Sequence, residues 1–419
     1  MAESSETPPA LPLGIEPADL RRHLYILGGG TWRLDLQLTL AFTLMRRGYG
    51  VGILDLKGSA SEHFLNAIPP AWVNDTFYWD FENRKYHPSL NLFEHSHADA
   101  GPRIADSIVG TFQGFFGTDG VGHRSAYILG GTVLALLEVP GTTLYHVRTV
   151  LMNKRYRSFI QTKAKSREVR AFWQYFAELE RSRDYGQIMS PLLNKLGAIF
   201  FNFRATNPFA QQTSSIDLAH FMQAGIMVCI NLCERELGTR QAKLVGDLIL
   251  SQFNRASQKR RGIQSTKRRD FFLFIPDAHA FSEEVIAPLL SDASSHLNMV
   301  IGNQTVGKRR AEFAECGSFL AMKCGTEDVE TVVSELATIK FDQRKVMAGM
   351  AMAGRPIYGR MYDATFDEFG DAFHSGVDPL SYQRYGMGES IKRQSLNRYY
   401  RSRSRVERRL SWFERQWDE

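Results

Sequence analysis

Three consecutive glycines, Gly28 to Gly30, follow the short apolar run at residues 23–27. A glycine-rich turn between a strand and a helix can present backbone N–H groups to phosphate, and the positive end of the helix dipole attracts the same anion. A glycine triplet alone is equally compatible with a simple flexible turn. The elements on either side of the glycines therefore decide between the two interpretations.

The segments around the glycines predict a strand–helix–strand unit. The stretch at residues 34–45 is mostly apolar and ends in Arg46-Arg47-Gly48, a basic last turn and glycine stop that are typical of a helix. Val51–Asp55 then has the pattern of a second strand. This order predicts a βαβ unit with a parallel sheet and a right-handed crossover. We therefore interpret the glycine turn as a relic phosphate loop.

The rest of the chain extends this α/β pattern around a helical segment. Apolar residues recur at helical spacing between about residues 99 and 209, and strand patterns return at residues 225–231, 271–275 and 299–303. We predict an α/β fold, a mainly parallel doubly wound sheet with an all-α insertion. The expected segments are a flexible leader (1–20), a first core segment (21–98), the insertion (99–212), a second core segment (213–360) and a basic helical tail (361–419).

Composition indicates an ordered, globular protein. The chain has 419 residues, 43% of them hydrophobic and 23% charged, which excludes disordered and fibrous proteins. Lys and Arg exceed Asp and Glu by 51 to 45, a small excess that fits a bland basic surface as well as a nucleic-acid partner. No apolar run approaches the roughly 20 residues that cross a bilayer, and residues 1–12 lack a signal-peptide pattern. We expect a cytoplasmic protein.

No metal site is predicted. Four cysteines in a chain of this length indicate a reducing compartment. Cys229 and Cys233 lie four positions apart along one predicted strand, too far for one tetrahedral site, and are interpreted as structural thiols. His95, His97 and Asp99 fall in a loop-like stretch without a second pair of ligands, so we expect a solvated loop there.

Seven features follow one another in an order shared with one protein family. After the glycine loop come Ile53-Leu54-Asp55-Leu56-Lys57-Gly58-Ser59, Leu90–Phe93, Leu134–Leu144, Ile230-Asn231-Leu232 before Leu237-Gly238, the strand before Pro276-Asp277, and the strand ending in Asn303-Gln304. In these features the chain resembles the FtsK–HerA branch of P-loop motor ATPases. It is most similar to the conjugative-transfer (type IV secretion) coupling ATPases, over roughly residues 20–415. The resemblance implies a RecA-like core, ATP with Mg²⁺ as cofactor, DNA as partner and a hexameric ring.

The phosphate loop departs from the family pattern, which is similar to Gly-x-Thr-Gly-x-Gly-Lys-Ser/Thr. The aligned residues are Gly28, Gly29, Gly30, Thr31, Trp32, Arg33, Leu34 and Asp35. Leu34 therefore stands in place of the lysine that neutralises the outer phosphates, and Asp35 in place of the Mg²⁺-binding hydroxyl. A carboxylate near the start of the helix competes with phosphate for the same positive field. Substitution of Arg33 for the lost lysine remains an alternative.

The second acidic motif departs from the family as well. Where relatives carry Asp-Glu after the strand, this chain has Pro276-Asp277, so the metal-holding carboxylate is missing and Asp277 aligns with the catalytic base. By the same resemblance, Gln304 corresponds to the residue that senses the γ-phosphate, and Arg255 to an arginine that reaches a neighbouring subunit. Each lost contact to a phosphoryl-transfer transition state commonly lowers the rate by about 100-fold or more. We therefore expect a pseudo-ATPase that retains remnants of a site.

Basic residues cluster in two segments near the predicted strand ends. Contacts to a phosphate backbone at these segments would be sensitive to salt and blind to sequence. A solvated, charged linker is the equal alternative. The candidate DNA-binding residues are Lys259, Arg260, Arg261, Lys267, Arg268, Arg269, Lys308, Arg309 and Arg310.

The tail from Ser381 interleaves basic and aromatic residues. Four apolar residues share one predicted helical face, namely Val406, Leu410, Phe413 and Trp417. We expect this face to dock on the core or on a neighbouring subunit, and base stacking by the aromatic residues is the alternative.

The leading hypothesis is a catalytically degenerate, non-hydrolysing DNA-binding or scaffold subunit of a ring or secretion-like assembly. An active paralogue would supply the catalytic lysine, and ATP with Mg²⁺ would bind weakly if at all. One alternative is a divergent but active ATP-dependent DNA translocase that uses Arg33, Asp277 and Gln304. The other is a protein-interaction module that has lost both nucleotide and DNA.

Overall fold

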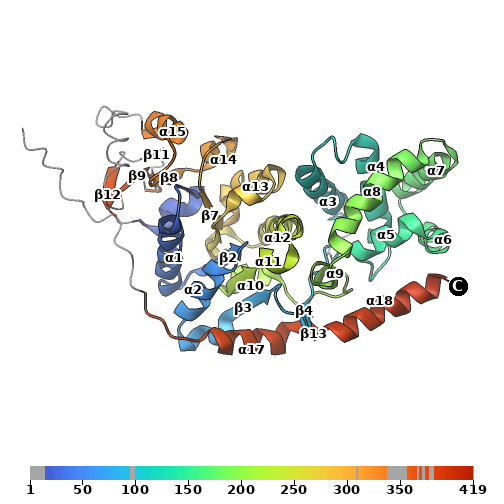
Figure 1. Cartoon of the computed structure of the whole chain (residues 1–419), viewed down its shortest axis with the longest axis horizontal. Helices are drawn as coiled ribbons and strands as arrows, with labels where there is room; N and C mark the ends of the chain where they lie inside the picture. The colour runs from blue at the N-terminus through green and yellow to red at the C-terminus, as the bar shows by residue number, and fades with distance from the viewer. Residues whose placement is uncertain are drawn as a thin grey trace, which may run out of the picture.

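The computed structural model describes residues 15–94, 100–307, 310–336, 356–365, 368–369, 373–376 and 382–418. A sheet with helices on its faces forms one part of the molecule, and a group of helices lies beside it (Figure 1). The end of the chain, drawn in red, runs along both parts: α17 (Gly388–Tyr399) lies under the sheet and α18 (Arg403–Asp418) under the helical group (Figure 1).

Nine strands of the described residues form the central sheet, in the order β12-β9-β8-β1-β7-β6-β2-β5-β3. Neighbouring strands are parallel from β8 to β3, whereas β9 is antiparallel to both β8 and β12. The strands are β1 (Leu24–Leu27), β2 (Gly50–Asp55), β3 (Thr76–Asp80), β5 (Met227–Asn231), β6 (Phe271–Ile275), β7 (Leu297–Asn303), β8 (Ser318–Ala321), β9 (Pro356–Arg360) and β12 (Phe373–Gly376). Two small antiparallel ladders pair β4 (Tyr86–Pro88) with β13 (Tyr400–Ser402), and β10 (Tyr362–Asp363) with β11 (Glu368–Phe369).

The central strands are buried on both faces, as an apolar parallel strand between helices should be. In β6, Phe271, Leu273 and Ile275 belong to one apolar cluster, and the alternate residues Phe272 and Phe274 belong to the other. Side chains of successive strand residues point to opposite faces. The continuous Phe-Phe-Leu-Phe-Ile run therefore supplies both halves of the core.

Helices cover each face of the sheet. One apolar cluster includes α1 (Thr31–Arg46) and α2 (Ser59–Ala67), whereas the other includes α12 (Thr239–Arg260) and α13 (Glu283–Leu290). The remaining helices of the core are η1 (Pro17–Arg22), η2 (Pro70–Asp75), α10 (Leu218–Ala224), α11 (Glu234–Leu237), η4 (Ser265–Lys267), η5 (Ala278–Ala280), η6 (Ala293–Ser295), α14 (Arg310–Glu315) and α15 (Thr326–Leu336).

Between β4 and β5 the described chain is helical up to residue 209 and forms the group beside the sheet (Figure 1). Two of its long helices, residues 123–137 and 167–181, pack closely, since a Cβ atom added at Gly131 would lie only 2.2 Å from the ring of Phe172. The helices are α3 (Gly101–Phe116), α4 (His123–Leu137), α5 (Leu144–Met152), α6 (Lys154–Thr162), α7 (Arg167–Arg181), α8 (Tyr185–Phe200) and α9 (Phe203–Phe209).

Residues 388–418 form a C-terminal strap that contacts both parts of the molecule. On the sheet side, the backbone N–H of Tyr78 donates to Oγ of Ser395 over 3.0 Å. On the helical side, the ring of Phe413 packs against His146 and Tyr156 at centroid distances of 4.5 and 5.0 Å. The predicted amphipathic face of the tail thus docks on the body of the protein.

The predicted fold class is confirmed: a mainly parallel α/β sheet carries an all-α insertion. The sequence patterns did not reveal β3, β4, β8 or the antiparallel edge strands β9 and β12. Across the described residues, none of the helices combines the length and the apolar character required of a membrane span.

Candidate functional site

The carboxyl ends of β1, β7, β6 and β2 lie next to one another, because these four strands are adjacent and parallel. The chain leaves them at Gly28, Gln304, Pro276 and Leu56 respectively. Ligands of open α/β sheets bind at this kind of edge. Several predicted site residues that are far apart in the sequence are therefore brought to one edge of the sheet.

The three glycines form a short connection whose N–H groups are mostly used internally. Gly28 has φ 148° and donates its N–H to the carbonyl of Asn303 over 3.0 Å, and Gly29 donates to the carbonyl of Lys323 over 3.1 Å. A Cβ at Gly28 would also lie 2.9 Å from Cβ of Met322. A phosphate cradle needs such N–H groups to converge on the ligand. Here two of the three are satisfied by neighbouring strand ends.

Helix α1 begins early, at Thr31, after Gly30 with φ 78°. The last five residues aligned with the phosphate-loop pattern, residues 31–35, are therefore helical. Leu34 is half-buried and packs against the apolar cluster of this face. Asp35 lies in the second helical turn, and the first turn carries no acidic residue. The expectation that Asp35 places its charge at the helix N-terminus is thus wrong, because the helix starts four residues before it.

Arg33 occupies the centre of this edge. Its side chain is only 5% exposed; Nε donates to the carbonyl of Gly28 over 3.1 Å, and Nη2 donates to Oδ1 of Asp277 over 3.0 Å. The guanidinium also lies against Gly302, where an added Cβ would be 2.5 Å from Nη1. Arg33 is therefore committed to the protein's own carboxylate and carbonyl.

Asp277 has a second cation beside it. Nζ of Lys57 lies 3.8 Å from Oδ2 of Asp277, whose side chain is 11% exposed. Lys57 belongs to the turn after β2, where the carboxylate of Asp55 accepts hydrogen bonds from the N–H of Lys57 (3.0 Å) and of Ser61 (2.7 Å). Burial is the largest influence on Asp55 and raises its pKa. Asp55 therefore holds the turn that places Lys57 beside Asp277. Lys57 was not among the site residues predicted from the sequence.

Gln304 and Asn303 differ in environment although they are adjacent. Gln304 is exposed at the end of β7. Asn303 is buried; its Nδ2 donates to the hydroxyl of Tyr25 over 2.8 Å, and its Oδ1 accepts from the N–H of His279 over 2.7 Å. Asn303 thereby ties the ends of β1 and β6 together, while Gln304 remains accessible at the same edge.

Arg255 is used inside the chain. In α12, its Nη1 donates to the carbonyl of Leu92 over 2.5 Å and its Nη2 to the carbonyl of Glu94 over 2.8 Å. Burial lowers its pKa to about 10. The side chain fastens the segment that leads into the helical insertion, so it is not extended toward a neighbouring subunit.

The candidate DNA-binding arginines before β6 donate mainly to backbone carbonyls. Three of them do so, and the acceptors are Arg269 for Arg260, Ser294 and Ile263 for Arg268, and Ala224 and Gly48 for Arg269. Two others form ion pairs, Lys259 with Asp217 at 3.5 Å and Arg261 with Asp292 at 2.6 Å. Lys267 is exposed. Most of this basic segment closes turns at the amino end of the sheet.

The two basic segments lie at opposite ends of the parallel strands, one at the amino ends and the other at the carboxyl ends. Residues 259–269 precede β6, whereas Arg310 follows β7 and begins α14. In parallel strands these are opposite ends. Lys308 and Arg309, like His95, His97 and Asp99, lie outside the described residues. The sequence grouping therefore does not correspond to one continuous surface.

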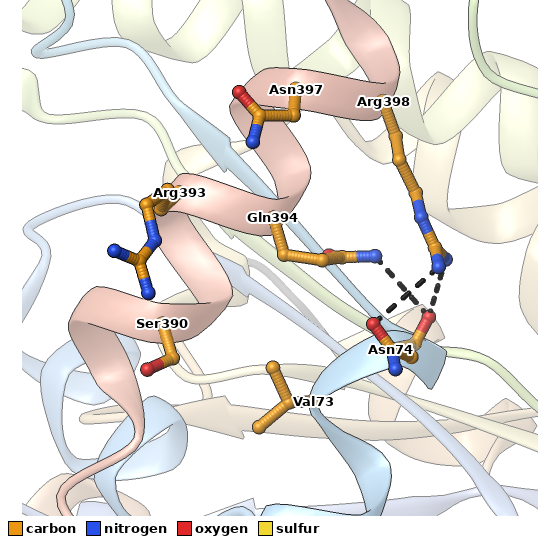
Figure 2. Close-up of a pocket in the computed structure, with 7 residues that line it drawn as sticks. All are labelled: Val73, Asn74, Ser390, Arg393, Gln394, Asn397 and Arg398. Carbon is orange, nitrogen blue, oxygen red and sulfur yellow. Dashed lines mark hydrogen bonds between the residues drawn. The ribbon is translucent and has the colours of Figure 1, made fainter.

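Two surface hollows lie away from this edge. One, of about 330 Å³, separates α17 from η2; Figure 2 shows Arg398 and Gln394 of α17 both directed at Asn74, whose carbonyl accepts from Arg398 Nη1 over 2.9 Å. These contacts explain how α17 attaches to the core. The other, of about 280 Å³, lies between α18 and the helical insertion. Among the described residues, no group of three or more His, Cys, Asp or Glu side chains is placed to hold a metal ion.

The fold has counterparts among solved structures. The bacterial conjugative coupling protein TrwBdeltaN70 in complex with sulphate aligns with a TM-score of 0.59 and 14% identity, over 87% of this chain and 88% of that one. TrwB in complex with ADP and Mg²⁺ gives a TM-score of 0.60 and 12% identity, over 88% of each chain. The chain has the fold of a conjugative coupling protein.

This coupling-protein fold was expected from the order of sequence features, and the resemblance is confirmed at the level of the fold. TrwB with a non-hydrolysable ATP analogue aligns equally well, with a TM-score of 0.59 and 13% identity over 88% of each chain. No family model matches the sequence, and no curated protein matches it. Ligands of open α/β sheets bind at the carboxyl ends of the strands. Residues of this chain that differ from the family pattern at the ends of β1, β7, β6 and β2 are therefore the differences relevant to nucleotide binding.

Proposed function

We propose that this protein is a non-hydrolysing subunit with a coupling-ATPase fold, which acts as a scaffold in a ring or secretion-like assembly. The observation that carries the proposal is the ion pair between Arg33 and Asp277, at 3.0 Å in the position where nucleotide chemistry is expected. An ion pair between two largely buried side chains neutralises both the only cation of the phosphate loop and the only candidate base.

The glycine connection supports the same conclusion from the backbone. Gly28 and Gly29 donate their N–H groups to the carbonyls of Asn303 and Lys323. A phosphate entering this turn would have to break these bonds, and each broken bond in a buried setting leaves a polar group unsatisfied at about 1–3 kcal/mol. Leu34 offers no positive charge in compensation.

The candidate base is held in a form unsuited to catalysis. A general base must reach the attacking water with a free lone pair. Asp277 instead accepts from Arg33 and lies near Lys57, so both carboxylate oxygens face cations. Proline at position 276 also leaves no carboxylate to hold Mg²⁺ there. The alternative in which Arg33 replaces the missing lysine would require it to leave Asp277.

A role as scaffold is better supported than DNA contact through the predicted basic segment. Arg260, Arg268 and Arg269 donate to carbonyls, and Lys259 and Arg261 are paired with acidic side chains. An active paralogue in the same assembly would supply the catalytic lysine. TrwB, whose fold this chain shares, has been solved in complex with ADP and Mg²⁺.

The test is to measure phosphate release and nucleotide binding with the purified chain. We expect no Mg²⁺-dependent ATP turnover, with or without DNA, and no restoration by Leu34→Lys alone. ATP with Mg²⁺ should leave the melting temperature unchanged, whereas a ligand at 100 times its Kd stabilises the native state by about 2.7 kcal/mol. Turnover that disappears in Asp277→Ala would refute the proposal and favour the active translocase, and contaminating ATPases would be insensitive to that substitution.

A further inference from the structure

Three polar side chains are connected by hydrogen bonds at the amino ends of β6 and β7, opposite to the phosphate-loop edge. Nδ1 of His296 lies 3.0 Å from Oδ1 of Asp270, and Nε2 of His296 lies 3.2 Å from Oγ of Ser265. Asp270 directly precedes β6, His296 directly precedes β7, and Ser265 begins η4. Contacts from a carboxylate to a histidine and from the histidine to a serine activate serine nucleophiles on unrelated folds, where they are recognised by geometry.

Asp270 is placed to fix the ring of His296. Its side chain is only 9% exposed, and its Oδ2 accepts from Nε and Nη2 of Arg21 over 3.2 and 2.9 Å. Its Oδ1, which faces His296, also accepts from Nδ2 of Asn298 over 3.3 Å. Because a carboxylate only accepts hydrogen bonds, the proton of the neutral imidazole lies on Nδ1. Nε2 is thereby left as the acceptor for the hydroxyl of Ser265.

The imidazole of His296 has the protonation state that a general base requires. Burial is the largest influence on it and lowers its pKa; Asp270 opposes this shift, and Arg21 and Arg268 add to it. The ring is therefore uncharged at neutral pH. The residue has φ 57°, which is uncommon for a residue with a side chain, and its carbonyl accepts from the N–H of Phe271 over 2.9 Å. Such conformations persist where the surrounding structure fixes them, and they cluster at functional sites.

Ser265 is exposed, so an electrophile can reach its hydroxyl from solvent. A network that only stabilised the turn before β6 would be complete with the contacts of Asp270 to Arg21 and His296. A hydrogen bond from an exposed hydroxyl adds little to the free energy of unfolding. The contact between Ser265 and His296 therefore bears on the reactivity of the hydroxyl more than on stability.

We propose that Ser265 is an activated nucleophile that accepts the acyl group of small, activated esters, with His296 as its general base and Asp270 as a positioning residue. Oγ of Ser265 bonds to the acyl carbon and the ester C–O bond breaks, while the proton moves from Oγ to Nε2 of His296 and then to the leaving oxygen. Water then attacks the acyl-serine, gives its proton to Nε2, and releases the carboxylic acid as the proton returns to Oγ. The inference does not depend on the proposed lack of ATP turnover, because this site lies at the other end of the strands.

The experiment treats the full chain with a tagged fluorophosphonate, whose phosphorus bonds to Oγ of an activated serine as fluoride leaves. Peptide mapping by mass spectrometry should place the adduct on Ser265, and p-nitrophenyl acetate should release a burst of about one equivalent of p-nitrophenolate. Ser265→Ala should abolish both signals. His296→Asn should slow labelling by about 100-fold or more, the contribution of a positioned general base, and asparagine tolerates the left-handed backbone conformation.

Ser294→Ala is the matched control. Ser294 is also exposed and lies two positions before His296, but its hydroxyl donates to Oδ1 of Asp292 over 2.9 Å. This variant should be labelled at the wild-type rate. Adducts spread over several serines, or wild-type labelling of His296→Asn, would overturn the proposal. Unchanged circular dichroism and melting temperature confirm that each variant is folded.

The pH profile of labelling gives a readout that does not rely on loss of the site. In the wild type the rate should level off above about pH 7, once His296 is neutral. Asp270→Asn should lower this plateau and move its midpoint to lower pH, because the charge that raises the pKa of His296 is removed; a loss of stability alone would not move the midpoint. A wild-type rate that rises about tenfold per pH unit up to about pH 9 would contradict the proposal, since it indicates attack by an unassisted serine.

Discussion

The guanidinium of Arg33 lies 3.0 Å from the carboxylate of Asp277, across 244 positions of sequence, and joins helix α1 to the end of β6. This contact fills the edge of the sheet where a coupling ATPase would handle the outer phosphates. Its contribution to the stability of the core, and its bearing on the proposed lack of ATP turnover, can both be measured.

Arg33→Met should destabilise the protein by about 3–5 kcal/mol, because it leaves the largely buried Asp277 with only the more distant Lys57. The double variant Arg33→Met with Asp277→Leu should recover to within about 1 kcal/mol of wild type, since an apolar pair of similar volume replaces the ion pair. Urea unfolding of the four proteins in the cycle gives these values. A double variant as unstable as Arg33→Met would contradict the ion-pair account.

Gly302→Ala should cost about 1–3 kcal/mol of stability. The added methyl would lie 2.2 Å from Nε2 of Gln37, 2.5 Å from Nη1 of Arg33 and 2.9 Å from the carbonyl oxygen of Pro276. Gly29→Ala is the control, because its new Cβ would meet nothing nearer than 4.0 Å. Chemical denaturation should separate the two variants clearly, and equal effects would show that Gly302 is not constrained by its neighbours.

Acid should destabilise the protein between about pH 6.5 and pH 4. His23 is fully buried, and desolvation lowers its pKa from 6.5 to about 4 in the native state. The unfolded chain therefore binds the proton first as the pH falls, so His23 alone lowers the stability by at most about 1.4 kcal/mol per pH unit in this window. Nδ1 of His23 accepts from the N–H of Met299 over 3.0 Å, which requires an unprotonated nitrogen.

His23→Asn is the variant that tests this direction of the pH dependence of stability. The Oδ1 atom of asparagine can accept the same N–H hydrogen bond without titrating. Compared with wild type, its urea midpoint should fall less between pH 7 and pH 5. His87 and His146, whose pKa values burial also lowers to about 4, should keep part of the acid sensitivity. A variant with the full wild-type pH dependence would exclude His23 as a contributor.

Phe413→Ala should destabilise the chain by about 1–3 kcal/mol, because its partly buried ring packs against His146 and Tyr156. Trp412→Ala, one position earlier on the same helix, should change stability by less than about 0.5 kcal/mol, since Trp412 is 64% exposed. Thermal unfolding of both variants distinguishes the docked face from the free face. Comparable losses would mean that Trp412 is also part of the packing.

Local patterns were sufficient to predict the fold class and one face of the tail. The apolar run at residues 271–275 has strand length, and the spacing of Val406, Leu410, Phe413 and Trp417 is helical, so each can be recognised without its partner. The antiparallel strands β9 and β12 could not be predicted in the same way. Pairing at the edge of a sheet depends on distant chain segments more than on local periodicity.

Some residues of the candidate edge could be named from the sequence, but their contacts could not. The replacement of lysine by Leu34 is visible in the sequence, whereas the pairing of Arg33 with Asp277 depends on the strand order β1-β7-β6. For the basic segment at residues 259–269, the sequence pattern suggested a role that the contacts do not support. In the sequence, Arg260, Arg268 and Arg269 have the pattern of a charged surface, but in the structure they donate to backbone carbonyls. This could not be predicted, because a charge pattern does not reveal which donors already have an acceptor within the fold.

The outer edge of β3 is closed by side chains from the strap. The N–H of Tyr78 donates to Ser395, the N–H of Asp80 donates to the hydroxyl of Tyr400, and that hydroxyl donates to the carbonyl of Tyr78. These partners lie more than 310 positions later in the chain. During synthesis, the strand is thus made long before the residues that cover it, and its free edge can pair with other chains until position 400 has left the ribosome. Shortened products that stop before the strap should consequently aggregate.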